Sequence, residues 1–502
     1  MKAYTKIILI AGLFLSVTSC SDFLEELPTR GTDEPVQRLE QLVALLDAPT
    51  FTERFRFTCL VGTDNFELPR DLWRAFPASW GPAALPFYTF QVEGVATRPS
   101  DMFWNDLYAE MFRANLILEN VDYVSGDADL RAQVRAEAYF LRAYLNFTLA
   151  NKYILPYHPD NHNELGLPRK ISTSPEEDFS RMTLRETWDL IEEDLERALM
   201  VRGSSPNTTH RANNRATVNA LVSRVMLHKG DWDRVITASE YALNNSGIVQ
   251  LKDYAVLGYA GNIGIFANPP DTIGWSEVRD WSTPQFFNWQ EFFYVRVSFF
   301  NVGRLVASPS LLASFNREHD LRYRWFFQNT TRDWGTTEFR DRDDIRIFTF
   351  GFSNLSFMPA GISIQEVMLN KAEALVRRSS PDVGAAMALV NELRAHRMAP
   401  HPERTLTAAS PDEALLYVLA ERRRELPFTH RWGDIRRFAF TPTTIDDVVV
   451  TREFYEVRPD GTVNTSVIKT YTLPLRSRRY AVPINETEII NSRGRLVQNI
   501  YY

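Results

Sequence analysis

Apolar side chains form a stripe at helical spacing between residues 130 and 149. The stripe recurs every three or four residues and consists of Leu130, Val134, Ala138, Leu141, Leu145 and Leu149. This spacing puts all of them on one face of an α-helix. A similar pattern covers residues 101–123. The two segments together predict an antiparallel helix pair.

A second helix pair is predicted on either side of a tight turn at Gly230. Apolar residues are spaced helically over 218–225 before the turn and again over 232–243 after it. A small residue suits the turn, and Ala242 suits a close crossing of two helices. This pair resembles a tetratricopeptide repeat, although Val235 stands where alanine is usual.

Two further pairs extend the helical pattern toward the C-terminus. One covers residues 362–397 with a break at Ser379-Ser380-Pro381-Asp382, where Asp382 is a candidate helix cap, and the other begins with residues 411–426. Such pairs cannot bury their apolar faces alone, and stacking them makes a continuous core. The sequence predicts a mainly α fold, an α/α superhelix of four tetratricopeptide-like helix pairs at about 101–250 and 361–440.

Two long regions lack this helical period. Residues of about 51–100 and 250–360 are rich in proline, glycine and aromatic side chains. Long insertions inside a compact domain usually carry a function. These regions predict a loop-rich, partly irregular second face.

The N-terminus has the order of a bacterial lipoprotein signal. Lys2 and Lys6 precede an apolar run at 7–17, which is too short to span a hydrocarbon core of about 30 Å. The run ends in Val17-Thr18-Ser19-Cys20, which resembles a lipobox. We therefore expect a signal peptide at 1–19, lipid attachment at Cys20, a tether at 20–35 and a single domain at 36–502.

Composition and the absence of known motifs exclude several functions. Cys59 is the one cysteine left beside Cys20, so no internal disulfide is expected. The formal net charge of −7 argues against a nucleic-acid-binding protein. The chain has no phosphate-binding glycine loop and no Gly-x-Ser-x-Gly turn. No cofactor, metal ion or catalytic residue is therefore expected.

Motifs of one protein family follow one another along the chain. They are "CSDFLEELP", "AEAYFLRAYLNFTLANKY", "VMLNKAEALVRR", "LAERRRELPFTHRWGDIRRF" and "YAVPINETEIINSRGRLVQNIYY". The fourth carries a recurring pattern at Glu421, Arg422, Glu425, Leu426, Arg431, Asp434 and Arg437. On these motifs the chain resembles the SusD/RagB family. It departs from the family pattern at Thr429-His430, where an acidic residue and glycine are usual, and at Ile500, where Pro-Gly is usual.

The resemblance implies a function as well as a fold. SusD/RagB proteins are non-enzymatic lipoproteins on the outer face of the outer membrane. They capture oligosaccharides and deliver them to a SusC-like TonB-dependent barrel transporter. The competing hypotheses are a tetratricopeptide scaffold that binds only protein, a receptor for peptide uptake by the same type of transporter and, with the least support, a glycoside hydrolase.

Ligand contacts in such a protein would come from the loop-rich regions. Sugars stack their C–H faces on aromatic rings and place their hydroxyls against polar side chains. The candidate stacking platforms are Trp73, Trp80, Trp275 and Trp281, and the candidate polar contacts are Asp64, Asn65 and Arg70. No motif fixes these contacts, because they vary with the substrate.

Overall fold

The computed structural model describes most of the chain and is dominated by helices. It describes residues 36–47, 52–54, 57–80, 84–92, 101–254, 291–299, 305–329, 345–348, 357–458 and 461–500. Its α-helices are α3 (Leu39–Asp47), α4 (Phe57–Val61), α5 (Arg70–Ala75), α6 (Leu85–Tyr88), α7 (Met102–Asn120), α8 (Ala128–Tyr153), α9 (Leu184–Ala198), α10 (Arg215–Lys229), α11 (Trp232–Asn244), α13 (Pro309–Leu312), α14 (Leu321–Phe326), α15 (Ile364–Arg377), α16 (Val383–Arg397), α17 (Pro411–Glu425), α18 (Arg431–Phe438) and α19 (Glu486–Asn491). The prediction of a mainly α fold is confirmed.

Short strands form four small sheets among the described residues. The strands are β1 (Thr52–Arg54), β2 (Leu165–Pro168), β3 (Arg181–Thr183), β4 (Phe292–Phe299), β5 (Phe327–Asn329), β6 (Arg346–Phe348), β7 (Phe357–Ser363), β8 (Val450–Val457) and β9 (Val463–Leu473). In the largest sheet β4 is central, parallel to β1 and antiparallel to β7. The other three sheets are the antiparallel pairs β2–β3, β5–β6 and β8–β9.

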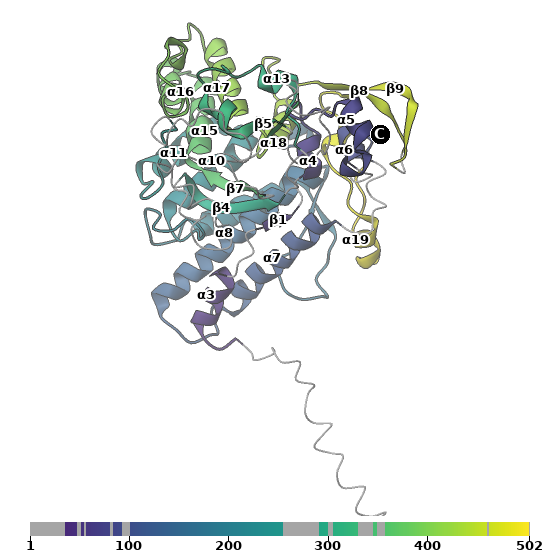
Figure 1. Cartoon of the computed structure of the whole chain (residues 1–502). Coiled ribbons are helices and arrows are strands. Elements are labelled where there is room, and N and C mark those ends of the chain that lie inside the picture. Colours follow the sequence, from purple (N-terminus) through teal and green to yellow (C-terminus); the bar gives the residue numbers. More distant parts are fainter. Residues whose placement is uncertain are drawn as a thin grey trace, which may run out of the picture.

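Helices that follow one another along the chain pack together in pairs (Figure 1). α7 contacts α8, α10 contacts α11, and α15 contacts both α16 and α17. α8 also contacts α9, and α11 contacts α15, so the pairs join into one body of helices. Each helix expected from periodicity is present within a few residues of its predicted bounds. The tetratricopeptide-like geometry of the pairs stays a prediction.

Polar caps explain where several of these helices begin and end. The carboxylate of Asp101 accepts from the backbone N–H of Phe103 and Trp104 at the start of α7, and it also accepts from the Tyr153 hydroxyl at 2.6 Å. It thereby ties the start of α7 to the end of α8. Asp382 accepts from the N–H of Ala385 at 2.9 Å, which confirms it as the cap of α16.

The turn between α10 and α11 depends on Gly230. This residue has φ +75° and ψ +21°, the left-handed conformation that favours glycine at the end of a helix. Its N–H donates to the carbonyl of Leu227, and the N–H of Asp231 donates to that of Met226. The glycine expected in this turn from the sequence is thus required by the backbone.

The motif over residues 419–438 forms a buried network of ion pairs. Arg422 binds Asp434 at 2.8 Å, and Arg437 binds Glu373 of α15 at 2.5 and 2.7 Å. Glu421 accepts a hydrogen bond from Arg394 of α16 at 2.9 Å. A buried charge is costly unless it has a partner, and each of these has one. The network therefore holds α15, α16, α17 and α18 together.

The C-terminal motif is docked onto the end of α8. The side chain of Asn499 donates to the carbonyl oxygens of Tyr153 at 2.9 Å and Val482 at 2.7 Å. Gln498 donates to the carbonyl of Ile484 at 2.7 Å. Amide side chains thus fix the described end of the chain, residues 482–500, to the helical body.

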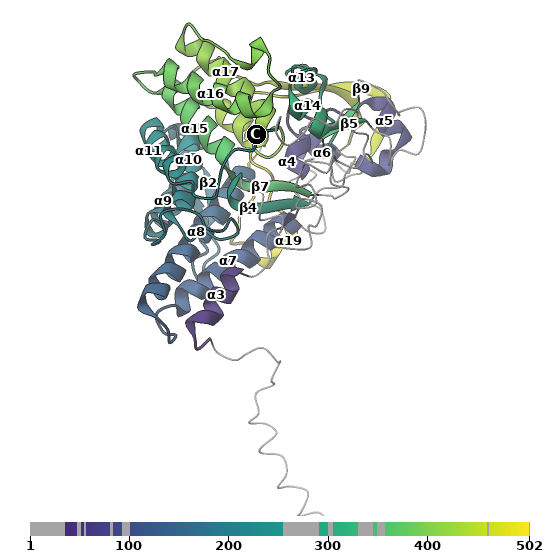
Figure 2. The ribbon, with the colours of Figure 1, turned by 60° about the vertical axis from the view of Figure 1, so that its left-hand side comes forward.

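A second face, which consists mainly of short helices and strands, lies beside this body of helices (Figure 2). Figure 2 shows α8 to α11 and α15 to α17 on one side, and α4 to α6, α13, α14, β5 and β9 on the other. The described parts of 51–100 and 250–360 consist largely of short helices and strands and are less irregular than the sequence indicated. None of the helices among the described residues is both long and apolar enough to cross a membrane.

Candidate functional site

Asp64 and Asn65, two of the predicted ligand contacts, lie in a turn after α4 and are held by arginine side chains. The carboxylate of Asp64 accepts from Nε and Nη2 of Arg431, both at 2.7 Å. Asn65 is fully buried, accepts from Nε of Arg423 at 2.6 Å and donates to the carbonyl of Pro427. These contacts fasten the turn to α17 and α18.

The protonation of Asp64 reflects the same contacts. Burial alone would raise the pKa of this carboxyl, because it disfavours the charged form. The guanidinium groups of Arg431 and Arg423 outweigh burial and hold the pKa of Asp64 below its usual value. Asp64 therefore stays ionised at neutral pH and serves the fold in this position.

Arg70, Trp73 and Trp80 lie close together in the sequence but differ in exposure. Arg70 begins α5, reaches solvent and lies 3.8 Å from the carboxylate of Glu453. Trp73 is 8% exposed, and its ring packs against Phe454 and Tyr455 at centroid distances of 5.7 and 5.6 Å. Trp80 is 1% exposed. A sugar needs an open ring face, so these two rings could stack on a glycan only if the segments that cover them moved.

The remaining predicted residues lie outside the described part of the chain. These are the stacking candidates Trp275 and Trp281 and the lipid attachment residue Cys20. All seven ligand-contact assignments stay predictions.

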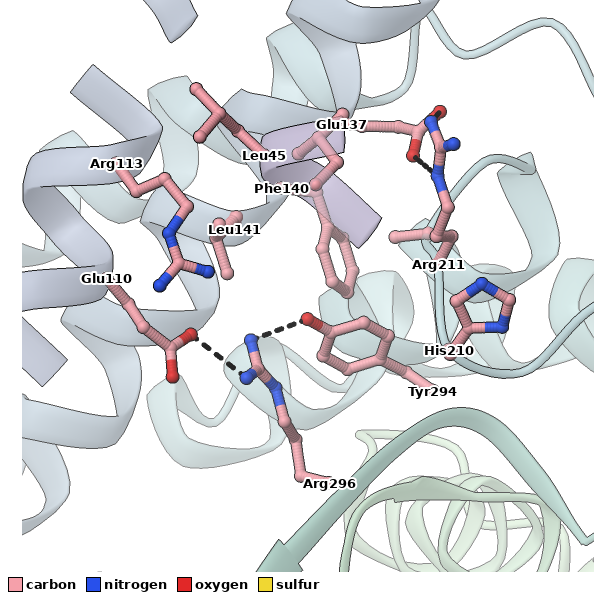
Figure 3. Close-up of a pocket in the computed structure, with 12 residues that line it drawn as sticks. Leu45, Glu110, Arg113, Glu137, Phe140, Leu141, His210, Arg211, Tyr294 and Arg296 are labelled. Atoms are coloured by element: carbon pink, nitrogen blue, oxygen red, sulfur yellow. Dashed lines mark hydrogen bonds and ion pairs between the residues drawn. The ribbon is translucent and has the colours of Figure 1, made fainter. Parts of the chain in front are cut away.

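A polar hollow between α3, α7, α8 and β4 is a site that the sequence did not indicate (Figure 3). It is lined by Leu45, Leu46, Glu110, Arg113, Glu137, Phe140, Leu141, His210, Arg211, Ala212, Tyr294 and Arg296. Its deepest side chains, among them Glu110, Tyr294 and Arg296, are at most 6% exposed. We call this site the hollow.

Two ion pairs mark the hollow, with the ring of Phe140 between them in Figure 3. On one side Arg296 lies 2.9 Å from Glu110 and donates to the hydroxyl of Tyr294 at 2.7 Å. On the other side Arg211 binds the carboxylate of Glu137 with two hydrogen bonds, at 2.8 and 2.9 Å. Paired, hydrogen-bonded groups of this kind have fixed positions.

Secondary structure brings these side chains together. Residues two apart on a strand face the same side, so Tyr294 and Arg296 of β4 both reach the hollow. The N–H of Val295, between them, donates to the carbonyl of Thr209 at 2.6 Å. That bond places the segment that carries His210 and Arg211 beside the strand. The edge of the Phe140 ring packs on Tyr294 at a centroid distance of 5.0 Å.

Burial and nearby charges shift the pKa values of two groups that line the hollow, Arg211 and His210. Burial lowers the pKa of Arg211, but Glu137 and Asp47 outweigh it, and the pKa lies above its usual value. For His210 burial outweighs the nearby Asp47, so its pKa lies below the usual 6.5 and the imidazole is neutral at neutral pH. A guanidinium can donate hydrogen bonds to hydroxyl groups, and a neutral imidazole can both donate to them and accept from them. Within the described residues, no three His, Cys, Asp or Glu side chains gather as metal ligands would.

Two family models match separate parts of the chain. Residues 87–227 match a model described as starch-binding and associating with the outer membrane, and residues 364–502 match the SusD family model. The chain belongs to the SusD family. No curated protein matches it.

Solved SusD-like structures share the fold of this SusD family protein. A SusD superfamily protein of Bacteroides thetaiotaomicron is 18% identical with a TM-score of 0.62, over 92% of this chain and 100% of that one. A SusD-like carbohydrate-binding protein of Bacteroides vulgatus is 16% identical with a TM-score of 0.59, over 91% and 97%. A laminarin-binding SusD-like protein is 16% identical with a TM-score of 0.58, over 93% and 100%. At these identities the likeness concerns the fold.

Proposed function

We propose that this SusD family protein is a non-catalytic, lipid-anchored glycan-binding protein on the cell surface. It captures oligosaccharides and delivers them to a SusC-like TonB-dependent transporter in the outer membrane. The observation that carries the proposal is the match of two SusD-type family models to residues 87–227 and 364–502. The carbohydrate-binding and laminarin-binding proteins of the same fold support it.

The chemistry of the hollow agrees with binding rather than hydrolysis. Glu110 and Glu137 are each paired with an arginine, an arrangement suited to accepting hydrogen bonds from hydroxyls. Glycoside hydrolysis instead needs a carboxylic acid that donates a proton, beside a second carboxylate.

Glycan binding is tested by electrophoresis of residues 21–502 through native gels that contain one polysaccharide each. At least one neutral polysaccharide is expected to retard the protein relative to a non-binding standard. Normal migration through every gel in a broad panel would contradict the proposal and favour a protein-binding scaffold or a peptide receptor.

Delivery to a transporter is tested separately by purifying the protein from detergent-solubilised outer membranes. A TonB-dependent barrel is expected to co-purify in a fixed ratio. Recovery of the protein without a barrel under gentle extraction would contradict the delivery step and leave glycan binding intact.

A further inference from the structure

The chain enters the described body beside an exposed aromatic side chain. The N–H of Ser125 donates to the carbonyl of Gln37 at 2.9 Å, and the N–H of Leu39 donates to the carbonyl of Ser125 at 2.9 Å. Tyr123 stands two residues before Ser125, in the turn between α7 and α8. It is 88% exposed, more than any other large apolar side chain in the described residues. The segment that leads from Cys20 to the body therefore arrives next to Tyr123.

The turn is fixed by contacts in which Tyr123 takes no part. The guanidinium of Arg131 donates to three carbonyl oxygens of the turn, those of Val121, Val124 and Gly126. Within the described residues, the Tyr123 side chain makes no hydrogen bond, ion pair or ring contact. Its ring is thus held at a fixed place on the surface and is open to a partner.

A second exposed apolar side chain lies at the same end of the molecule. Met200 follows α9 and is 71% exposed. Two residues further on, the N–H of Arg202 donates to the side chain of Gln133 at 2.9 Å, which attaches this segment to the start of α8. Single exposed apolar side chains are common on soluble proteins. Here two of the three most exposed ones lie where α7 ends and α8 begins.

The proposed lipid at Cys20 keeps this end near a membrane. Fifteen residues lie between Cys20 and Val36, so the point of entry cannot move further from the lipid than that segment reaches. A tether raises the effective concentration of two surfaces for each other, so contacts too weak for a free protein become populated. Tyrosine suits such a contact because its ring is apolar while its hydroxyl can stay in water, as in the aromatic belts of membrane proteins.

The charged side chains at this end do not form a cationic surface. The segments 36–47, 119–135 and 200–202 carry four basic and six acidic residues, which gives a formal net charge of −2. Several of them are paired, as Arg135 is with Asp122 and Arg202 is with Asp129. Anionic lipids attract clusters of basic residues. The surface that this end suits is therefore an electrically neutral one, reached through its apolar side chains.

We propose that Tyr123 and Met200 form a foot that rests in the headgroup region of a neutral lipid surface. The inference rests on the proposed lipid anchor and adds to it an orientation of the protein. α8 has 26 residues and is about 39 Å long, so its other end, at Tyr153, can lie that far from the lipid when the foot is in contact.

The test measures how near two parts of the anchored protein lie to the lipid. Protein acylated at Cys20 is placed on phosphatidylcholine vesicles that contain a lipid-linked energy acceptor. A fluorescent donor is attached at Ala128→Cys, beside the foot, or at Ile490→Cys on α19, and both positions are exposed. Cys59 is buried and should stay unlabelled, which protein without either substitution verifies.

The two donors are expected to differ because they lie near opposite ends of α7. Burial and the neighbouring carboxylate of Asp101 raise the pKa of Glu488, so α19 lies by the start of α7, away from α3 (Figures 1 and 2). α7 has 19 residues and is about 28 Å long, and we expect at least about twofold more energy transfer from position 128 than from position 490.

Variants separate the foot from the lipid anchor. The double variant Tyr123→Ser, Met200→Ser keeps Cys20 and should lower the transfer from position 128 to the level seen from position 490. The matched control Leu416→Ser, Ile468→Ser removes two half-exposed apolar side chains from α17 and β9, far from α3, and should leave the transfer unchanged. Tyr123→Trp keeps an interfacial aromatic ring and should keep the wild-type transfer.

The outcomes separate this inference from the proposed function. Equal transfer from the two positions, or unchanged transfer from position 128 in the double variant, would overturn the inference and leave the lipid anchor standing. If the double variant instead loses a co-purifying transporter while its transfer is unchanged, the exposed pair belongs to a protein interface and the inference also fails. Wild-type protein that does not stay on the vesicles would overturn the anchor and the foot together, and glycan binding is measured independently of both.

Discussion

At the residue scale, buried arginines join parts of the chain that are far apart in the sequence. Arg431 binds Asp64 across 367 positions, and Arg437 binds Glu373 across 64. The charged residues of the motif at 421–437 take part in such buried pairs, so their replacement would leave a buried charge without its partner. Packing therefore accounts for the charged residues of the pattern at 421–437.

Glu373→Gln should destabilise the protein strongly at neutral pH. Glu373 is fully buried between Arg437 and Arg377, and loss of its charge leaves both arginines without this counterion. Breaking a buried pair costs about 3–5 kcal/mol. Urea unfolding measures the change, and Glu196→Gln on the exposed face of α9 is the control, expected within about 0.5 kcal/mol of wild type.

The same pair predicts how stability depends on pH. Burial alone would raise the pKa of Glu373, but Arg437 and Arg377 outweigh it and lower that pKa from 4.5 to about 2. The carboxylate of Glu373 is therefore protonated at a higher pH in the unfolded chain than in the folded protein. The contribution, about 3 kcal/mol, is present above pH 4.5 and lost as pH falls toward 2.

Unfolding free energies of wild type and Glu373→Gln should consequently converge as pH falls from 5 toward 2. The free energies are compared at each pH by urea denaturation. A gap that stays constant over this range would show that the carboxylate charge is not what stabilises the wild type.

Single residues also set the limit of what the sequence could predict at the site. Glu137 lies in one of the family motifs, but its partner Arg211 does not. The opposite wall of the hollow comes from other segments, which carry Glu110, Tyr294 and Arg296 and share no spacing with Glu137 in the sequence. Their proximity depends on how β4 packs beside α7 and α8. Trp73 was predicted from its place in an aromatic region, but local composition does not report which rings the tertiary fold covers.

At the element scale, the long helices were predictable and the short strands were not. Helices such as α8 and α11 carry a periodic signal of their own, since apolar residues recur at helical spacing over 130–149 and over 232–243. β4 and β7, by contrast, pair across a long stretch of chain, with Tyr294 opposite Ile362. Such pairing leaves no local pattern, so these segments read as irregular.

Two glycine substitutions should have opposite effects on stability. Gly230→Ala forces an L-residue into the left-handed turn after α10 and should lower the free energy of unfolding by about 1 kcal/mol. Its new methyl group would meet Trp232 only at an ordinary 3.6 Å, so the cost lies in the backbone.

Gly384→Ala is the matched change inside a helix. Its methyl group would lie 3.7 Å from Asp382 in the first turn of α16, and alanine favours helix over glycine by up to about 1 kcal/mol. It should leave stability unchanged or raise it. Urea unfolding of both variants measures the signs, and a Gly230→Ala variant as stable as the wild type would contradict the assignment of Gly230 as a conformational requirement.

At the scale of the whole molecule, the start of the described chain lies beside the turn between α7 and α8. The N–H of Leu39 donates to the carbonyl of Ser125 at 2.9 Å, and α3 packs on both long helices (Figure 1). Fifteen residues lie between Cys20 and Val36, and the sixteen Cα–Cα steps reach at most about 55 Å. With the proposed lipid at Cys20, this end of the molecule stays within that distance of the membrane surface.

Cys20→Ser should release the protein from the membrane. Wild-type protein is expected in the membrane fraction with acyl chains on its N-terminal cysteine, as mass spectrometry would detect. The buried Cys59 is the matched control, and Cys59→Ser should remain in the membrane fraction. Membrane association of Cys20→Ser equal to that of wild type would contradict the lipid anchor.

The central claim is that the protein holds a glycan without changing it. One measurement tests this most directly: calorimetric titration of the mature protein with an oligosaccharide of the polysaccharide that retards it, followed by chromatography of the same sample. We predict saturable binding and recovery of the oligosaccharide at its original length. Shorter products, or no saturable binding to any glycan, would contradict the account.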